Sequence, residues 1–484
     1  MKKFKLIIFI LLVVSFILTL LYGIFGTSIS LLSINEIKKD RKLNQNLIDE
    51  IKINNVDTVY DKNNNIYYYT LPESYENIIY ILKLEIEGNY KYKIVNETLN
   101  IVKINYIKPI DIIIYNDKYY YETKIQITNL PLINIQTQNI IDLNYENSIF
   151  SYINQKETNK KFISNSKIKV RGATTKYYDK KPYRINFYSD RYTKETKISF
   201  SKFYMGDSLI LDALYRDSSK IRNLMSTELW NDISNDFTEV KIYSEFIELF
   251  INNEYKGLYI LTEPINKTKL NLNKSTDNDS SFIIKSTLGQ YEVKYPNDEK
   301  FFYRSIEITN TIISEYLKNG TNSTYEVIKN TFDLKNYVDI ILFNCFINNL
   351  DNNLVQNVYY YNGSLNSKKI FVHPWDMEWS FGITPQDNSR DSKIFDCTLI
   401  HPNAPEINKL LIKRYKELRK TILTKKYFDN KLDKYLNEIN KGAAKRDSDK
   451  WYEYDVEKEI EDIRIWIYNR LDYMDEYIEG LENE

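Results

Sequence analysis

The pattern of apolar and polar residues begins with one long apolar run. Residues 6–25 contain no charged side chain, and three lysines precede them. At about 1.5 Å rise per residue, a helix over this run crosses a hydrocarbon core of roughly 30 Å. The lysines favour a cytoplasmic N-terminus, which places the residues after about 30 outside the cytoplasm. A cleaved secretion signal is the alternative, although no small-residue cleavage site follows. Residues 1–29 are therefore expected to be a membrane anchor or an uncleaved signal.

The next hundred residues change from a helical to a strand pattern. Residues 30–55 are polar and are expected to form a helical stalk that leads away from the membrane. From about 56 to 130 apolar and polar positions alternate, and Tyr, Ile and Val dominate. Alternation with turn signals at 87–89 and 115–117 predicts a small antiparallel, sandwich-like β-module. Residues 30–130 thus form a second unit, in which no residue pattern points to chemistry.

From about 131 the pattern becomes mixed. Two strand-like runs, "SKIKVRGATTK" and "KKPYRINFYS", are joined by a polar turn, and "DSSKIRNLMSTELWNDIS" reads as a capped helix starting near Asp217 or Ser218. Residues 243–265 predict a hairpin around Asn252, and further strands are expected in "SFIIKS" and "NVYYY". Apolar helices are expected across 323–350.

The C-terminal part of the chain, after about residue 403, has a helical pattern. "PEINKLLIKRYKELRKTIL" and "VEKEIEDIRIWIYNRLDYMDEYIEGL" carry apolar residues at three- and four-residue spacing. A β-rich half followed by an α-rich half predicts an α+β fold with two lobes for residues 131–484.

Charge and composition exclude some classes of function. Lys and Arg number 66, equal to Asp and Glu, so the formal net charge is zero. Nucleic acid is therefore not expected as the main partner, because proteins that bind phosphate backbones normally have a net basic face. The chain has only two histidines and two cysteines, without zinc-ligand spacing, which argues against a zinc enzyme. Cys345, in an apolar run, is expected to be a buried apolar side chain, with a disulfide to Cys397 as the alternative.

The first candidate site is the pair of basic strands. Arg171 and Gly172 end one strand, and Lys181 and Arg184 lie on the other. A glycine turn with two threonines between basic strands is able to cover a phosphate with backbone N–H groups. Basic hairpins are common on soluble proteins, so this motif alone is weak evidence for a phosphate site.

The second candidate site follows the apolar helix. Asp351 begins a loop rich in asparagine, and Asn357 stands just before a predicted strand. An acid beside amide side chains suits the orientation of a hydroxyl or the coordination of magnesium. Asp and Asn also favour turns for local reasons, so this interpretation stays open.

The third candidate is the stretch "HPWDMEWSFG" at 373–382. Asp376 and Glu378 lie two residues apart among Trp375, Trp379 and Phe381. Ionised carboxylates among aromatic rings need a partner that offsets their desolvation. A hard divalent cation held by Asp376, with Glu378 as a further ligand, would supply it.

The order of these motifs resembles that of the spore-coat protein H (CotH) kinase family, whose members are atypical relatives of protein kinases. The matching motifs are "VRGATTKYYDKKPYRINF", "LDALYRDSSKIRNLMSTELW", "IELFINNEYKGLYILTEPI", "NNLDNNLVQNVYYY" and "FVHPWDMEWSFG". The resemblance covers about 131–480 and implies a kinase-like domain with a helical C-terminal region. It also implies ATP- and Mg²⁺-dependent phosphate transfer to Ser or Thr of a protein, such as a surface or spore-coat-like protein.

The resemblance also assigns roles to single residues. Lys181 would contact the ATP phosphates, with Arg171 and Gly172 shaping the cover, and Glu263 would lead into the lobe connection beside adenine. Asp351 would orient the acceptor hydroxyl as the catalytic acid. The magnesium ligands would be Asn357 and Asp376, with Glu378 as a further candidate. These roles fit a loose phosphoryl-transfer transition state, which positioning and metal charge stabilise.

Two departures from the kinase pattern leave an alternative open. Asp351 and Asn357 are six residues apart, whereas the ordinary interval is five, and Glu378 stands where many relatives have a second Asp. The alternative is a catalytically weak or inactive kinase fold that serves as a structural or binding surface protein. Transfer of AMP is a third possibility. The sequence does not identify the protein substrate or the oligomeric state.

Overall fold

The computed structural model covers most of the chain after the N-terminal apolar run. It describes residues 32–483 apart from 45–47, 49, 72–77, 98–99, 158–159, 202–203, 235–239, 273–280, 288–289, 298–321, 350–355, 363–368, 384–399 and 440. Within these ranges no helix combines the length and the apolar character that crossing a membrane requires. The membrane anchor predicted at 6–25 lies outside the described residues and stays a prediction.

The N-terminal unit is a β-module, as the alternating pattern predicts. Its main sheet has the order β4-β5-β11-β10-β8, and β1 pairs with β11. These strands are β4 (Val59–Asp61), β5 (Ile66–Thr70), β11 (Tyr119–Thr128), β10 (Ile110–Tyr115), β8 (Lys91–Ile94) and β1 (Lys42–Leu43). Two small sheets complete the module: β3 (Val56–Asp57), β2 (Ile51–Ile53) and β7 (Leu84–Ile86), and β6 (Ile79–Ile81) with β9 (Ile101–Lys103).

Two expectations for this module are wrong. The predicted stalk at 30–55 is helical only in α2 (Ile34–Lys39), which a Ser33–Glu36 capping box starts and Asp40 ends. The rest of its described residues include strands β1 and β2, because Ile51 and Ile53 pack into the core of the module. The main sheet is mixed and not purely antiparallel, since β5 and β1 both pair with β11 in parallel.

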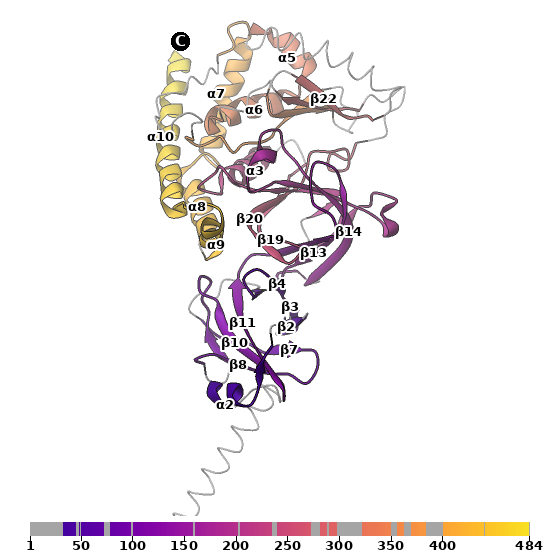
Figure 1. Ribbon diagram of the computed structural model, residues 1–484. Coiled ribbons are helices and arrows are strands. Elements are labelled where there is room, and N and C mark those ends of the chain that lie inside the picture. Colours follow the sequence, from indigo (N-terminus) through magenta and orange to yellow (C-terminus); the bar gives the residue numbers. More distant parts are fainter. Residues whose placement is uncertain are drawn as a thin grey trace, which may run out of the picture.

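Seven strands then close a barrel in the middle of the molecule (Figure 1). Around the barrel they are β12 (Leu132–Thr137), β13 (Glu146–Ile153), β14 (Lys161–Val170), β15 (Tyr183–Phe187), β18 (Ser208–Asp212), β20 (Glu254–Thr262) and β19 (Ser244–Ile251). Alternate side chains of each strand point into the barrel and fill it. In β15, Tyr183, Ile185 and Phe187 are buried in the interior, and Arg184 and Asn186 point outward. The predicted hairpin around Asn252 is confirmed by the antiparallel pair β19 and β20. A small ribbon, β16 (Ile198–Ser199) with β17 (Met205–Gly206), and two 3₁₀ turns, η2 (Thr175–Tyr177) and η3 (Asp190–Tyr192), lie in the loops between barrel strands.

A second, antiparallel sheet lies beyond the barrel and is accompanied by helices. Its order is β22 (Gln290–Tyr295), β21 (Ile283–Thr287), β23 (Val358–Asn362) and β24 (Ile370–Pro374). The helices near it are α3 (Arg222–Ile233), α5 (Tyr325–Thr331) and α6 (Leu334–Ile347). The predicted capped helix begins later than expected, at Arg222. Asp217 still bonds its start, because its carboxylate accepts from the Arg222 N–H at 2.9 Å.

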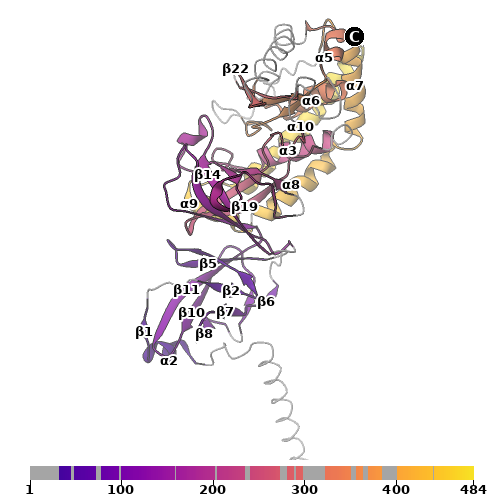
Figure 2. The same cartoon turned by 90° about the vertical axis from the view of Figure 1, so that its right-hand side faces the viewer.

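The predicted helical C-terminal region is confirmed. It consists of α7 (Pro405–Arg419), α8 (Lys425–Ile439), α9 (Ala443–Lys450) and α10 (Val456–Asn483). Figures 1 and 2 show α8 and α9 beside the barrel and the long α10 running up to the second sheet. Apolar stripes of these helices join α3, α6 and β23 in the largest core of the molecule. The mixed α+β class is therefore confirmed.

Cys345 lies in this core, on α6. Its side chain is buried, as predicted from the apolar run, and it is disulfide-bonded, which was the alternative interpretation. Cys397, the other cysteine of the sequence, lies outside the described residues.

Helix α9 joins the β-module to the barrel. The Arg446 guanidinium donates to both carboxylate oxygens of Glu248 in β19, and also to the carbonyl of Tyr106 in the module. Glu248 is fully buried, and this ion pair satisfies its charge. The module is thus bonded to the helical region through a charged contact, and its apolar core continues into the barrel at Phe250 and Tyr255.

Gly382 is a position at which a side chain does not fit. Its φ is +83°, and a Cβ there would lie 2.8 Å from Nε1 of Trp466, whose ring packs on this turn from α10. We expect Gly382→Ala to lower the free energy of unfolding by about 3 kcal/mol, because strain and a ring clash add. Chemical denaturation measures this. Gly480→Ala, in α10 with nothing within 4 Å of the added Cβ, is the control and should stabilise by up to about 1 kcal/mol. Equal stability of the Gly382→Ala variant and the wild type would contradict the packing described.

Candidate active site

A cavity of about 390 Å³ lies between the outer face of the barrel and the turn that follows β24. The barrel contributes apolar and small polar side chains from β18, β19 and β20, among them Ile210, Ile260 and Thr262. Opposite them stand the residues of the aromatic stretch, from His373 to Trp379. Both signs of charge line the cavity: the acids are Asp212, Asp376 and Glu378, and the bases are Arg171, Lys180, Arg216 and Lys285. The cavity therefore combines an apolar wall with a charged end.

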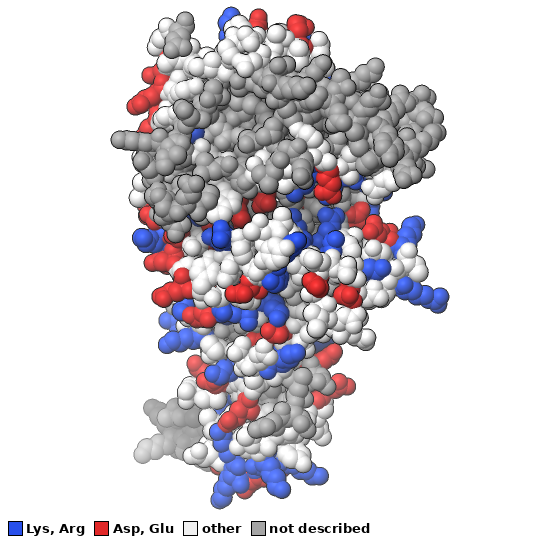
Figure 3. All heavy atoms as spheres, turned by 45° about the horizontal axis from the view of Figure 1, so that its top comes forward, with Lys and Arg blue, Asp and Glu red and all other residues white. Residues whose placement is uncertain are grey.

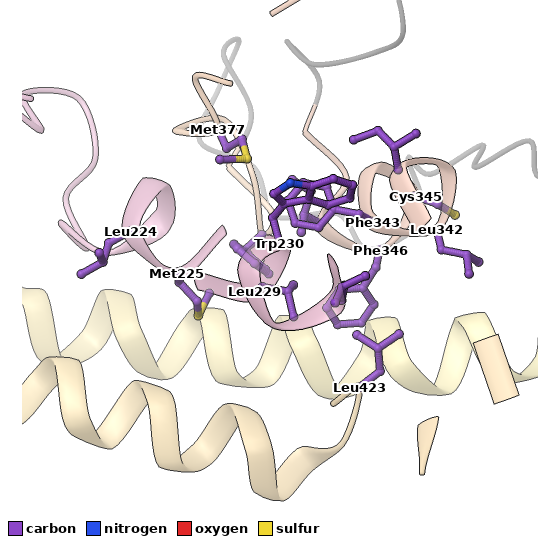
Figure 4. Close-up of a cluster of buried hydrophobic side chains, with 14 of the residues drawn as sticks. Leu224, Met225, Leu229, Trp230, Leu342, Phe343, Cys345, Phe346, Met377 and Leu423 are labelled. Carbon is purple, nitrogen blue, oxygen red and sulfur yellow. The ribbon is translucent and has the colours of Figure 1, made fainter. Parts of the chain in front are cut away.

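The turn at 375–378 directs its two acids into this cavity through an apolar anchor. Met377 is buried in the large core near Trp230, as Figure 4 shows, and the flanking Asp376 and Glu378 both line the cavity. Asp376 has a φ of +61°, an uncommon conformation for a residue other than glycine. The burial of Met377 on one side thus accounts for two carboxylates on the other.

Hydrogen bonds fix the position of this turn. The Asn349 amide, at the end of α6, donates to the Asp376 carbonyl at 3.2 Å. Asn223 of α3 accepts from the Met377 N–H at 3.3 Å and donates to the Asp212 carboxylate at 2.7 Å. The Arg222 guanidinium, also of α3, donates to the Ser380 carbonyl at 3.0 Å. Helix α3 therefore links Asp212 to the acidic turn.

Asn357, another predicted metal ligand, faces Trp375, the residue before Asp376 in the turn. Its side chain lines the cavity, and its carbonyl accepts from the Trp375 N–H at 2.9 Å. Its φ is +52°, so both predicted ligands stand in left-handed backbone conformations, which cluster at functional sites. Asp351, the predicted catalytic acid, lies outside the described residues, and the sequence reaches it two positions after Asn349.

The acids of this cavity repel one another. Burial raises the pKa of Glu378 well above its usual value, and the negative charges of Asp376, Asp212 and Asp217 raise it further, while Arg216 opposes them. A divalent cation would relieve this repulsion, so the donor set fits magnesium. In the described ranges no three Asp, Glu, His or Cys side chains form a metal site by themselves. Amide or phosphate oxygens would therefore have to complete the coordination.

The raised pKa of Glu378 has a consequence for stability. As the pH rises above 4.5, the unfolded chain releases this proton before the folded protein does, so the folded state loses stability. We expect Glu378→Gln to remove this cost. Its free energy of unfolding should exceed that of the wild type at pH 7 and equal it near pH 4, without divalent cations. Urea denaturation at both pH values measures it, and a less stable variant at pH 7 would contradict the electrostatic picture.

Two of the four predicted nucleotide-binding residues line the cavity, and two do not. Arg171 and Gly172 line it, and Gly172 has a φ of +99° in the turn after β14. Lys181 does not line it, and its ammonium group donates to the Lys176 carbonyl at 3.0 Å. Glu263 is buried just after Thr262, where it accepts from the Tyr243 N–H at 2.8 Å and pairs with Lys269.

Sequence reasoning missed four residues of this cavity. Asp212 is the last residue of strand β18. An acid at the end of an apolar strand is a pattern that the sequence shows and that indicates a site residue. Lys285 lies on β21, near enough to Asp376 for their charges to interact. Asn223 is hydrogen-bonded to the Asp212 carboxylate and to the Met377 N–H of the acidic turn. Lys180 is fully buried and donates to the Asp447 carboxylate at 2.6 Å, a contact 267 residues away in sequence that no local pattern reveals.

His373 is packed into the wall of the cavity. It is buried, and its Nδ1 lies 2.7 Å from the Pro374 carbonyl oxygen. Burial lowers the pKa of its imidazole to about 4, so the ring is neutral at physiological pH. It packs edge-on against Trp230 and supports the wall of the cavity.

Comparison with known proteins agrees with the arrangement of these motifs. No curated protein matches this chain. A family model described as CotH kinase protein matches residues 168–474, a span that runs from β14 into α10 and includes every residue of the cavity. Because this match covers more than half of the sequence, the chain belongs to the CotH kinase protein family.

Proposed function

We propose that this protein is an ATP- and Mg²⁺-dependent kinase that phosphorylates Ser or Thr side chains of another protein. The observation that supports it best is the meeting of Asp376, Glu378 and Asn357 with Arg171 in one cavity. Family membership supports a kinase-like protein at a coarser level. Kinase chemistry needs this combination, because phosphoryl transfer depends on positioning and on charge stabilisation of the phosphates.

Each side chain has a proposed task. Asp376 and Asn357 would hold magnesium, which when bound neutralises charge on the phosphates, and Glu378 would be a further ligand. Asp351 would orient the acceptor hydroxyl and accept its proton. Met377, buried between the two acids, keeps their carboxylates aimed into the cavity without a share in the chemistry.

The proposed phosphate contacts differ from those expected from the motif alone. Arg171 and Lys285 line the cavity and are the better placed cations, because the Lys181 ammonium is bonded to the Lys176 carbonyl. Glu263 is tied to Tyr243 and Lys269, so we propose that it fixes the segment after β20 instead of contacting adenine through its carboxylate. The adenine ring of ATP would pack against the apolar wall formed by Ile210, Ile260 and Trp375.

The acceptor would be a protein at or beyond the membrane surface if residues 6–25 anchor the chain as proposed. Figure 3 shows Lys and Arg interspersed with Asp and Glu on the face in view, in keeping with a formal net charge of zero. This distribution favours a protein acceptor over a nucleic acid.

The test is a transfer assay with the full-length chain in non-ionic detergent. Magnesium is supplied with ATP labelled on either the γ- or the α-phosphate, and the acceptors are the chain itself and a Ser/Thr peptide library. We expect label from the γ-position only. Label from the α-position would show AMP transfer instead. Nucleotide binding without any transfer would favour the alternative, an inactive kinase fold that acts as a surface-binding protein. The repulsion between the acids around Glu378 is the observation that supports this alternative.

A further inference from the structure

A second cavity, also of about 390 Å³, adjoins the candidate active site. It opens between β14, β15 and the sheet strands β21 and β22, and the two cavities share Arg171, Gly172, Ile210 and Lys285. We call it the basic cavity, because its lining includes six cationic side chains: Lys169, Arg171, Lys176, Arg184, Lys285 and Lys294. None of its described lining residues is an Asp or a Glu.

The cations of the basic cavity fall into two groups. Arg171 and Lys285 line both cavities, and Lys285 lies near enough to Asp376 to interact with its charge. The other four line the basic cavity alone. These four would not be needed for a nucleotide whose phosphates lie beside Asp376, so they require another explanation.

Neutral groups, and not carboxylates, hold most of these four side chains. The Arg184 guanidinium donates to Asn186 at 3.2 Å and to Ser208 at 3.4 Å. The Lys169 ammonium lies 4.5 Å from the centre of the Tyr145 ring, and the Lys176 ammonium lies 5.0 Å from that of Tyr177. Lys294 pairs with Glu292, which does not line the cavity. The positive charge that faces the cavity is therefore only partly compensated.

The charges in the basic cavity act on one another. Burial lowers the pKa of Lys169, and the positive charges of Arg184 and Lys294 lower it further. Burial also lowers the pKa of Lys285; Asp376 opposes this, and Arg171 and Lys294 add to it. Like charges that lower one another's pKa lie close together, and an anion bound among them would reverse the repulsion.

We propose that the basic cavity is a phosphate-binding site separate from the nucleotide site. Several Lys and Arg side chains around one recess are the usual means of recognising a phosphate ester or a dense run of phosphates. Two ligands share this chemistry: a phosphorylated side chain of a protein and free polyphosphate. With the first, the kinase would recognise acceptors that already carry a phosphate near the site of transfer.

The test measures binding to the full-length chain by isothermal titration calorimetry in a phosphate-free buffer. The probes are a phosphoserine peptide, its unphosphorylated counterpart and tripolyphosphate, each with and without magnesium and a saturating non-hydrolysable ATP analogue. We expect the phosphoserine peptide to bind in both conditions and its counterpart not to bind. Binding of tripolyphosphate alone would support the site and identify free polyphosphate as the ligand. Displacement of both probes by the ATP analogue, or binding of neither, would overturn the proposal.

Variants locate the binding in the cavity. Lys169→Gln and Arg184→Gln should each weaken phosphate binding at least about tenfold, as the loss of a charge-assisted contact predicts. The matched control is Lys167→Gln, because Lys167 is a half-buried lysine on the same strand and face as Lys169 but does not line the cavity. Equal weakening by the control would overturn the proposal, and Lys294→Gln, on another strand, gives a further measurement should one variant fold poorly. No turnover is needed, so the result stands whatever the kinase activity.

Discussion

Asp376→Asn is expected to abolish phosphoryl transfer while the protein stays folded. The carboxylate is exposed in the cavity at the end of a turn that Met377 and two asparagines hold in place, so the amide changes charge without removing packing. Loss of a negatively charged magnesium ligand removes charge stabilisation from the transferring phosphoryl group. We expect the rate of γ-phosphate transfer to fall at least about a thousandfold.

The matched control for this variant is Asp179→Asn. Asp179 is an exposed acid in the loop between β14 and β15 that does not line the cavity, so its removal should leave the rate within about twofold. Transfer by Asp376→Asn at the wild-type rate would refute the assignment of this carboxylate. Thermal unfolding of both variants shows whether the fold is retained.

Asp447→Ala is expected to produce a large loss of stability. Asp447 is fully buried on α9, where one oxygen accepts from Lys180 at 2.6 Å and from the Leu258 N–H at 2.9 Å. The other oxygen lies 3.7 Å from the ammonium group of Lys220. Lys180 and Lys220 have no exposed side-chain surface. Among the described residues, Asp447 is the one carboxylate that forms an ion pair with each of them. The free energy of unfolding should fall by about 3–5 kcal/mol.

A neighbouring acid on the same helix supplies the comparison for Asp447. Asp449 is exposed and pairs with Lys445 one turn earlier, so Asp449→Ala should change stability by less than about 0.5 kcal/mol. Both variants are measured by urea denaturation at pH 7. Burial lowers the pKa of Lys180 to about 8 even with Asp447 present, so part of the loss should be recovered as the pH rises and the lysines are neutralised. Equal stability of the two variants would contradict a buried charge cluster.

The elements that sequence patterns predicted are those marked by a clear apolar run or an apolar stripe. The hairpin around Asn252 is an example, since two apolar strands flank a turn in which Asn252 and Asn253 both have positive φ. The C-terminal helices are another, because their apolar stripes pack into one core. The pattern at 30–55 misled because Ile51 and Ile53, two apolar positions in a polar segment, are enough for a short strand once neighbouring strands are present.

The site residues that the sequence predicts correctly are those whose direction is set by their immediate neighbours in the chain. Asp376 and Glu378 face the cavity because Met377 between them is apolar, a feature visible in the sequence. Lys181 was chosen by its place in a motif, but strand position alone does not determine where a long side chain ends. Its ammonium group meets a carbonyl of the preceding turn.

The remaining site residues depend on tertiary contacts. Lys285 reaches the cavity because β21 pairs with β23, 70 or more residues later in the chain, and Asp447 reaches Lys180 from a helix near the C-terminus. No local pattern encodes such contacts. For the same reason the basic cavity, which is lined from six strands and the turn after β14, is not apparent from the sequence.

The acidic turn and Asn357 are proposed to form a divalent-cation site that works together with a nucleotide. Its most direct test is the binding of Mn²⁺ to the full-length chain, followed by electron paramagnetic resonance with and without a non-hydrolysable ATP analogue. We predict that the analogue strengthens Mn²⁺ binding to the wild type and that Asp376→Asn loses this nucleotide-dependent binding. Mn²⁺ binding that is the same with and without the analogue, or the same in the wild type and in Asp376→Asn, would contradict the account.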